Sequence, residues 1–367
     1  MKIIHIVHSL RGGGIQNFIV SLASEQVKQK NDVTVIVIDK YNTEYCNHLE
    51  NILKSNNVNV IKLDKIQGNK FSLIKAISKC RKIIQKEKPD IINTHGEISH
   101  LYGALCTILT KIPQVITVHS AKENWNFIIN YFCQKKPLIF CSNSTKFDLQ
   151  RKPNHITTSI NNGISKDIIQ SHKASNLRKE YKLREQDKII ILVGSFRPAK
   201  NYLFLKDLVD ELKQDETYHF FVCGGKDVSN KDNIIETLKD YKTIHFLGLR
   251  SDISDIENES DLFLSCATFE GLPIAVLEAY FNGIPCVLSP IEQHIKISNI
   301  EKVWIPEDFT ATSFVKAIKL AINESNYSHE YIYKMREKQL EQYSITETAN
   351  QYERFYKKII STNKLNV

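Results

Sequence analysis

Short apolar runs alternate with longer amphipathic stretches along most of the chain. Runs such as residues 32–39 and 188–196 are rich in Ile and Val, which is typical of strands buried on both faces of a sheet. Most of the gaps between these runs are long enough for a helix. The pattern predicts strands at residues 2–9, 32–39, 58–64, 89–95, 114–120 and 138–144 in the first half, and at 188–196, 219–225, 243–249, 261–266 and 284–290 in the second. This alternation predicts parallel sheets covered by helices.

The chain divides by pattern into two α/β halves. Its 367 residues are too many for one core of ordinary size, which favours two domains. A turn at 162–163 opens a polar, charged segment at 160–188, so we predict one domain at 1–165 and a second at 166–345. The last stretch, 328–362, has a helical pattern with recurring aromatic residues, and these rings need a surface to cover.

Composition narrows the class of protein. The hydrophobic share is 42% and the charged share 25%, as in a soluble globular protein. There is no apolar run of about 18 residues, and the N-terminus has the pattern of a first strand, not of a signal peptide, so we expect a cytoplasmic protein. The eight cysteines are scattered without a C-x-x-C pair, which favours buried thiols over zinc or redox sites.

The positive charge is concentrated in the first half. Residues 1–165 carry 22 Lys and Arg against 11 Asp and Glu, and residues 166–367 carry 27 against 30. Four lysines, Lys75, Lys79, Lys82 and Lys86, recur at helical spacing, with Ile74, Ile77 and Ile84 available for the opposite face. Two interpretations stay open: a basic stripe that binds anionic lipid, or the solvated side of a helix covering a sheet.

Candidate chemistry lies just after the strands, because ligands of open α/β sheets bind beyond the carboxyl ends of the strands. Arg11 and three glycines, 12–14, follow the first strand and precede a helical pattern. Glycines let a backbone approach an anion or a sugar hydroxyl, although a tight turn explains them equally well. The spacing does not match the dinucleotide fingerprint, so a nicotinamide cofactor is disfavoured.

A second glycine-led loop follows the first strand of the second half. It places Arg197 and Lys200 three residues apart after Gly194. Two cations at the end of a strand suit a diphosphate, whose charge they can neutralise both in the bound ligand and in a leaving group. In the first half, His95 and His119 end two strands, and either could donate to a substrate hydroxyl or shuttle a proton.

The segment 269–287 is the most specific signal in the sequence. Glu270 lies in the loop before a predicted helix, and Glu278 lies within that helix, about 12 Å further along if the segment is fully helical. That separation is too long for an acid and a base acting on one bond. It suits two carboxylates that accept hydrogen bonds from different parts of an extended ligand, such as a nucleotide sugar.

Seven segments together resemble a retaining glycosyltransferase of glycosyltransferase family 4. They lie at 12–23, 117–120, 160–164, 193–201, 221–225, 246–250 and 269–287. The resemblance implies the GT-B fold, in which two doubly wound Rossmann-like α/β domains face each other across a cleft. It also implies that the C-terminal helix, about 346–367, crosses back to the first domain.

The resemblance implies a donor site in the second domain. Glu270 would bind hydroxyls of the donor sugar, Glu278 the ribose, and Lys200 the diphosphate. The segment Gly248, Leu249 and Arg250 would meet the nucleobase. Ser195 stands where many members have an arginine, so Arg197 is the candidate for that role. The full set of donor candidates is Gly13, Gly14, Gly194, Ser195, Arg197, Lys200, Gly248, Leu249, Arg250, Glu270, Gly271, Leu272, Pro273 and Glu278.

The first domain would then bind the acceptor. His119 matches the active-site histidine of the family better than His95 does, and Gln16 occupies a place where many members have glutamate. Gly12 completes the acceptor-side candidates. The residues expected to act in catalysis are His119, Glu270, Lys200 and Arg197.

The predicted activity is transfer of a hexose or N-acetylhexosamine from a nucleotide sugar, with a UDP-sugar favoured, to a glycan or lipid-linked saccharide in cell-surface polysaccharide synthesis. Closure about residues 160–170 would align the substrates. No D-x-D motif occurs, and we expect no metal and no cofactor. The alternatives are a non-catalytic nucleotide-sugar-binding subunit, a GDP-mannose-dependent mannosyltransferase, and an epimerase or phosphorylase of the same architecture. Peripheral contact with the inner face of the membrane would follow from the basic first domain.

Overall fold

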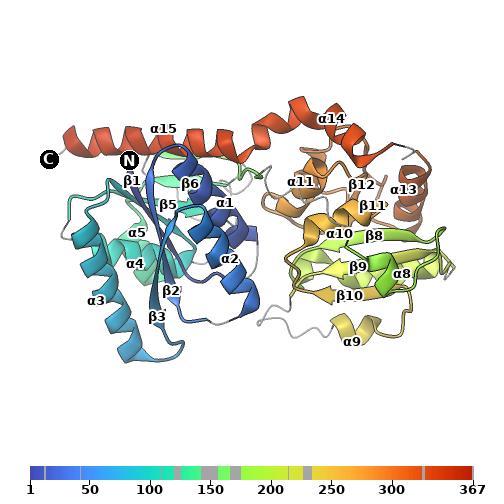
Figure 1. Cartoon of the computed structure of the whole chain (residues 1–367), viewed down its shortest axis with the longest axis horizontal. Helices are drawn as coiled ribbons and strands as arrows, with labels where there is room; N and C mark the ends of the chain where they lie inside the picture. The colour runs from blue at the N-terminus through green and yellow to red at the C-terminus, as the bar shows by residue number, and fades with distance from the viewer. Residues whose placement is uncertain are drawn as a thin grey trace. The chain divides into compact units, whose positions relative to one another are not determined.

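A computed structural model describes residues 1–11, 14–41, 43–108, 110–119, 125–141, 156–165, 175–213, 215–225, 234–324 and 327–365. The chain forms two compact units, each with its own sheet and core (Figure 1). Unit 1 comprises Met1–Gly163 and Tyr343–Val367, and unit 2 comprises Ile164–Gln342. The predicted doubly wound α/β architecture is confirmed in both units.

Unit 1 is built on a seven-stranded parallel sheet of order β3-β2-β1-β4-β5-β6-β7. The strands are β1 (Lys2–Val7), β2 (Asp32–Asp39), β3 (Asn59–Lys65), β4 (Ile91–His95), β5 (Gln114–Val118), β6 (Leu138–Phe140) and β7 (Thr157–Ser159). The short edge strand β7 was not predicted from the pattern. The order reverses between β1 and β4, the kind of switch point at which open sheets bind ligands.

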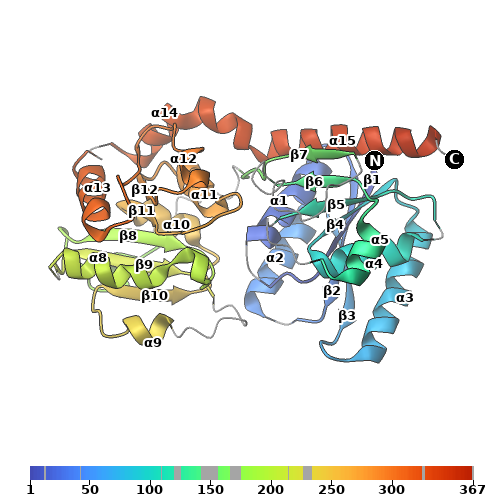
Figure 2. The same cartoon turned by 180° about the vertical axis from the view of Figure 1, so that it is seen from behind.

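Helices cover both faces of this sheet (Figures 1 and 2). The helices α1 (Gly14–Lys28) and α2 (Glu44–Ser55) share one core with the C-terminal helix α15 (Ile345–Leu365). Tyr352 and Tyr356 of α15 are fully buried in that core, so the aromatic pattern at the C-terminus marks the packed face of this helix. The other face carries α3 (Lys70–Glu87), α4 (Glu97–Thr107) and α5 (Phe127–Cys133).

Unit 2 has a six-stranded parallel sheet of order β10-β9-β8-β11-β12-β13. Its strands are β8 (Lys188–Val193), β9 (Tyr218–Cys223), β10 (Ile244–Gly248), β11 (Leu262–Ser265), β12 (Cys286–Leu288) and β13 (Val303–Trp304). Its helical elements are α7 (Leu177–Glu180), η2 (Pro198–Lys200), η3 (Tyr202–Phe204), α8 (Leu205–Glu211), α9 (Ile234–Leu238), α10 (Ile253–Glu259), α11 (Ile274–Phe281), α12 (Glu292–Ile295), α13 (Ala311–Asn323), α14 (His329–Leu340) and η4 (Glu341–Tyr343), which reaches into unit 1.

Local sequence signals begin and end several of these helices. The side chains of Asn69, Thr310 and Ser328 cap α3, α13 and α14 by accepting from backbone N–H groups in the first turn. Helix α11 ends before Gly283, which has φ 69°, and a Cβ at that position would lie 1.9 Å from the carbonyl oxygen of His329. Only glycine therefore allows α14 to pack this closely on the end of α11.

The cysteines have the state that their scattered pattern favours. All eight cysteines are buried thiols. Within the described ranges, none of the helices combines the length and the apolar character needed to cross a membrane.

Candidate functional site

Three strand-end loops of unit 2 are joined to one another by backbone hydrogen bonds. The N–H of Gly194, after β8, donates to the carbonyl of Cys223 at 2.9 Å, and the N–H of Gly224, after β9, donates to that of Gly248 at 2.8 Å. The N–H of Phe196 donates to Gly225 at 3.0 Å. The predicted glycine positions of this edge are thus held in one fixed backbone frame.

Gly224 is a glycine because another backbone lies against it. A Cβ built there would be 1.9 Å from the carbonyl oxygen of Gly194, a contact that no side chain could make. The sequence marks this position only as the first of two glycines after a strand. Its structural role, the close approach of two loops, depends on the neighbouring strand.

Lys200 and Glu270 form the centre of the candidate donor site. The Nζ of Lys200 lies 2.5 Å from Oε1 of Glu270, and both side chains are largely shielded from solvent. The loop that carries Glu270 is tied to η2, because the N–H of Thr268 donates to the carbonyl of Ala199 at 2.9 Å. Two residues that are 70 positions apart in the sequence therefore meet at the carboxyl edge of the sheet.

A buried tyrosine and Lys200 both lie close to Gly194. The hydroxyl of Tyr202 donates to the carbonyl of Gly194 at 2.9 Å, and burial raises the pKa of Tyr202 well above its usual value. A Cβ at Gly194 would meet both Tyr202 and the side chain of Lys200 within about 3 Å. The absence of a side chain at Gly194 thus leaves space for the side chain of Lys200. The sequence alone did not indicate this role of Gly194.

Glu278 lies on α11 in a poorly solvated environment. Burial raises the pKa of its carboxyl to about 7, and the nearby Lys200 opposes part of that rise. The helix begins only at Ile274, so the segment from Glu270 to Pro273 is not helical and the predicted axial separation of about 12 Å does not apply. Glu270 forms an ion pair with Lys200, and the charge of the same lysine also acts on Glu278.

A third carboxyl, which the sequence analysis missed, lies beside Glu278. Glu257 of α10 is fully buried, and burial followed by the charge of Glu278 holds its pKa well above the usual range. Its side chain accepts from the amide of Asn282, and the hydroxyl of Ser254 contacts the same Asn282 at 3.0 Å. Glu257 is an acid in an amphipathic helix by pattern, so no sequence signal separated it from a surface residue.

The other donor candidates near Lys200 and Glu270 in the sequence lie in the two loops that precede η2 and α11. Gly271 and Leu272 are partly exposed in the loop, and Pro273 is buried at the start of α11. Ser195 is half-buried, whereas Arg197 is exposed just before η2.

The segment predicted to meet a nucleobase has a preset conformation. Gly248 has φ 70°, Leu249 is 56% exposed, and the guanidinium of Arg250 is held by the carboxylate of Asp252 at 2.7 and 2.5 Å. A Cβ at Gly225 would press on Leu249. Arg250, held by Asp252, and the exposed Leu249 therefore follow Gly248 directly, and Leu249 lies against Gly225.

His294 is another missed residue of unit 2. It is fully buried, with Nδ1 3.0 Å from the carbonyl of Ser289. Burial lowers its pKa to about 4, and the charges of Glu270 and Lys200 act on it in opposite directions.

In unit 1, the sequence-predicted residues divide into two groups. Gly12 and Gly13 lie outside the described residues. Gly14 is exposed as the first residue of α1, and Gln16, two residues further on, is half-buried.

The two histidines, by contrast, are brought together. His95 ends β4, His119 follows β5, and Nδ1 of His95 lies 3.0 Å from Nε2 of His119. Both are buried, and the hydrogen bond joins the two candidate histidines into one connected pair.

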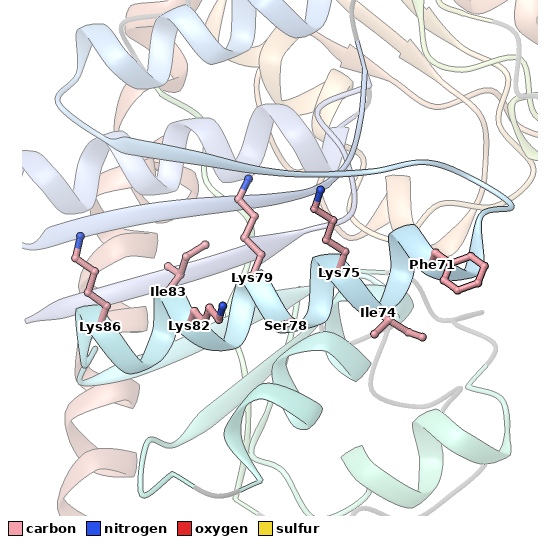
Figure 3. A pocket seen from close by; sticks show the side chains of 8 residues that line it. All are labelled: Phe71, Ile74, Lys75, Ser78, Lys79, Lys82, Ile83 and Lys86. Atoms are coloured by element: carbon pink, nitrogen blue, oxygen red, sulfur yellow. The ribbon is translucent and has the colours of Figure 1, made fainter.

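The basic stripe on α3 lies along an open groove of about 630 Å³ (Figure 3). Its lining consists of Phe71, Ile74, Lys75, Ser78, Lys79, Lys82, Ile83 and Lys86. The prediction that Ile74 lies on the face opposite the lysines is wrong: Ile74 is 66% exposed and shares their groove, whereas Ile84 is buried as predicted. Phe71 is 86% exposed, so the solvent face of α3 is both basic and apolar.

Comparison with known proteins shows which family this architecture represents. The model of glycosyl transferases group 1 matches residues 173–338, and that of Glycosyltransferase Family 4 matches residues 12–167. The two matches together span both units.

Relatives and solved structures agree with these matches. The Escherichia coli UDP-Gal:alpha-D-GlcNAc-diphosphoundecaprenol alpha-1,3-galactosyltransferase is 28% identical over 59% of this chain and 62% of its own length. The Bacillus anthracis N-acetyl-alpha-D-glucosaminyl L-malate synthase is 22% identical over 78% of this chain and 79% of its own length. The crystal structure of Anabaena HepE in complex with UDP and glucose has a TM-score of 0.78 at 14% identity, covering 98% of this chain and all of HepE, which shows the GT-B fold. The chain therefore belongs to the group 1, family 4 type glycosyltransferases with the GT-B fold.

Proposed function

We propose that this protein transfers a hexose or N-acetylhexosamine from a UDP-sugar to a lipid-linked or other glycan acceptor in cell-surface polysaccharide synthesis, with retention at the anomeric carbon. The observation that carries the proposal is the ion pair of Lys200 with Glu270 at the carboxyl edge of unit 2, with Glu278 near enough for the charge of Lys200 to lower its pKa. One cation between two carboxylates matches a ligand that presents hydroxyls on either side of a diphosphate.

The donor would use these three residues in turn. Glu270 accepts from hydroxyls of the sugar, and Glu278 accepts from the ribose. Lys200 carries the positive charge that stabilises the departing nucleoside diphosphate, with Arg197 as its partner. The carboxylate of Glu270 lies 2.5 Å from Nζ of Lys200, so a diphosphate that binds Lys200 would replace part of this ion pair. The side chains of Leu249 and Arg250 would lie against the nucleobase.

The charge of the leaving group would be stabilised without a metal ion, because two cationic side chains serve that purpose. A chelator should therefore leave the rate of transfer unchanged. Dependence of the rate on added Mg²⁺ or Mn²⁺, after dialysis against a chelator, would contradict this part of the proposal.

The acceptor would bind unit 1, beside His119, Gly14 and Gln16. Two observations support a lipid-linked acceptor at the inner face of a membrane. The name of the E. coli relative specifies a diphosphoundecaprenol acceptor. The solvent face of α3 combines four lysines with the exposed Phe71 and Ile74, a composition that suits anionic lipid.

A panel of nucleotide sugars tests the donor site by thermal shift. A ligand at 100 times its Kd adds about 2.7 kcal/mol to the free energy of unfolding, which gives a measurable rise in Tm. We expect a rise with a UDP-sugar, and loss of that rise in Glu278→Ala. The exposed Glu307→Ala variant should keep it. A rise only with GDP-mannose would favour the mannosyltransferase alternative, and an unchanged rise in Glu278→Ala would place the donor elsewhere.

Transfer itself requires a separate assay. Incubation of the identified UDP-sugar with a polyprenyl-diphosphate saccharide should yield a longer saccharide whose new bond has the anomeric configuration of the donor. Binding without transfer or hydrolysis would favour a non-catalytic subunit. Transfer to a small carboxylic acid instead would indicate an acceptor of the class named in the B. anthracis relative.

Membrane contact is tested by flotation with vesicles of 30% anionic lipid, on the order of a cytoplasmic leaflet. We expect binding at low salt that weakens as salt screens the charges. The double variant Lys82→Glu with Lys86→Glu should bind less, and Lys334→Glu with Lys338→Glu on α14 should bind as well as the wild type. No preference for anionic over neutral vesicles would refute the contact.

A further inference from the structure

Three buried histidines lie side by side on three neighbouring strands of unit 1. His5 is on β1, His95 ends β4 and His119 follows β5. In the sheet, His5 pairs with Asn93 and His95 pairs with Thr117. His95 therefore lies two residues beyond Asn93, the partner of His5. His119 likewise lies two residues beyond Thr117, the partner of His95. Because side chains alternate at every residue, this even offset puts all three imidazoles on the same face of the sheet.

The three imidazoles form one continuous chain of hydrogen bonds. Nδ1 of His5 lies 2.9 Å from Nε2 of His95, and Nδ1 of His95 lies 3.0 Å from Nε2 of His119. The chain begins on α1, where Oε1 of Gln26 lies 2.8 Å from Nε2 of His5. Gln26 is fully buried, so its amide oxygen is fixed within the core.

The inner two histidines are neutral. Burial lowers the pKa of His5 to about 4 and holds that of His95 well below its usual value. A neutral imidazole has one N–H donor and one lone-pair acceptor. Each hydrogen bond between two such rings uses the N–H of one ring and the lone pair of the other. The donor-to-acceptor direction of the first hydrogen bond therefore fixes the direction of all the others in the chain.

The direction follows from the oxygen of Gln26, which can only accept. Nε2 of His5 must then carry the proton, and Nδ1 of His5 must accept from Nε2 of His95. By the same step Nδ1 of His95 accepts from Nε2 of His119. Nε2 of His119 is therefore the donor in the last hydrogen bond of the chain.

We propose that Gln26 and His5 are positioning residues that act through His95 to fix the proton of His119 on Nε2, leaving Nδ1 as the nitrogen that accepts. The role of His119 in the reaction rests on the proposed function.

Packing keeps the last ring of the chain in place. The edge of Phe18, on α1, lies against His119 with ring centres 5.7 Å apart, and the centre of His95 lies 5.3 Å from that of His119. Helix α1 thus supplies both the acceptor at the start of the chain and an aromatic wall at its end. A purely space-filling role for these positions would be served by apolar residues, without three aligned hydrogen bonds.

The tautomer of His119 can be observed directly in the full-length protein. With ¹⁵N-labelled histidine, long-range ¹H–¹⁵N correlation spectra distinguish a protonated Nε2 from a protonated Nδ1, and the His119 signals are identified by their loss in His119→Gln. We expect His119 in the Nε2–H form at pH 7.5. A wild-type His119 protonated on Nδ1 would overturn the proposal. This measurement needs no substrate, so it stands even if the proposed transferase activity fails.

Variants at the start of the chain test the relay. Gln26→Leu removes the acceptor oxygen and Gln26→Glu keeps one, so only Gln26→Leu should give a mixture of His119 tautomers. His5→Phe should do the same, with a ring of similar size filling the site. The matched control is His245→Phe, because His219 and His245 of unit 2 also share a 3.0 Å hydrogen bond. An unchanged His119 tautomer in both Gln26→Leu and His5→Phe would overturn the proposal.

Kinetics give a second readout once the donor is known. Gln26→Leu should lower kcat on the order of ten- to a hundredfold, the scale expected when a residue that orients a functional histidine is lost. KM for the donor should stay near the wild-type value, because Lys200, Glu270 and Glu278 lie in unit 2. Gln26→Glu should retain most of the activity. A loss confined to KM, or an equal loss in Gln26→Glu and Gln26→Leu, would contradict a role through the tautomer.

Discussion

At the scale of single residues, the acid Glu278 is held in a state that pH can change. Burial raises its pKa to about 7, with Lys200 opposing the rise and Glu257 facing it as a second acid. Between the ordinary value near 4.5 and about 7, the folded protein holds a proton that the unfolded chain has lost. The contribution of Glu278 to the free energy of unfolding therefore falls as pH rises through this window.

Replacing Glu278 by glutamine removes this contribution. We expect the free energy of unfolding of Glu278→Gln to fall less than that of the wild type between pH 5 and pH 8, as measured by urea denaturation at each pH. The control Glu307→Gln changes an exposed, salt-bridged acid and should show the wild-type dependence. If Glu278→Gln and the wild type lost the same free energy over this range, the raised pKa would be refuted.

A second residue-scale prediction concerns Gly224. In Gly224→Ala the added Cβ must move the loop of Gly194, and with it the backbone that surrounds Lys200. We expect a Kd for the donor raised at least tenfold, about 1.4 kcal/mol, by isothermal titration. Gly68→Ala is the control: its φ of 79° is also unfavourable for alanine, but nothing lies within 4 Å of the new Cβ and the position is in unit 1. Equal effects of the two substitutions on donor affinity would contradict the loop contact.

At the scale of elements, one buried arginine joins α14 to α11, the helix that carries Glu278. The guanidinium of Arg336 is fully buried and donates to the carbonyls of Tyr280, Ile284, Glu301 and Lys302 at 2.7 to 3.3 Å. Two of these acceptors lie at and just beyond the end of α11, where helix carbonyls have no partner within the helix. The arginine thus caps a helix from another element.

Arg336→Met should destabilise the protein strongly. The apolar side chain would remove the four hydrogen bonds that Arg336 donates to buried carbonyls, at a cost of about 3 kcal/mol in the free energy of unfolding. Urea denaturation followed by circular dichroism measures this loss. Lys334→Met, two residues earlier in α14, breaks only an exposed pair with Glu330 and should leave the free energy of unfolding close to the wild-type value. A cost in Arg336→Met as small as in this control would show that the carbonyls find other donors.

At the scale of the whole molecule, the eight cysteines share one chemical state. All are buried thiols distributed over both units. We expect almost no reaction with a thiol reagent within minutes in the native protein, and reaction of all eight after denaturation without a reductant. Fewer than eight reactive thiols in the denatured chain would reveal a disulfide and contradict this description.

Much of this molecule is readable from the sequence by itself. The Ile- and Val-rich runs determined the strands, because strands buried on both faces must be apolar throughout. The short strands β7 and β13 escaped prediction, since β7 contains no apolar residue and β13 has only two residues. Glu270 and Glu278 stood out as acids in an apolar segment, and the strand-end loops placed Lys200 and His119 at the ligand-binding edge.

Only the tertiary structure decided which of these residues meet. The pairing of Lys200 with Glu270, the acid Glu257 behind Glu278 and the chain from Gln26 to His119 all join segments far apart in the sequence. The exposure of Ile74 likewise depends on which side of α3 the sheet covers. Local pattern fixes the type and direction of each element, whereas contacts between elements depend on strand order and register, which no local pattern records.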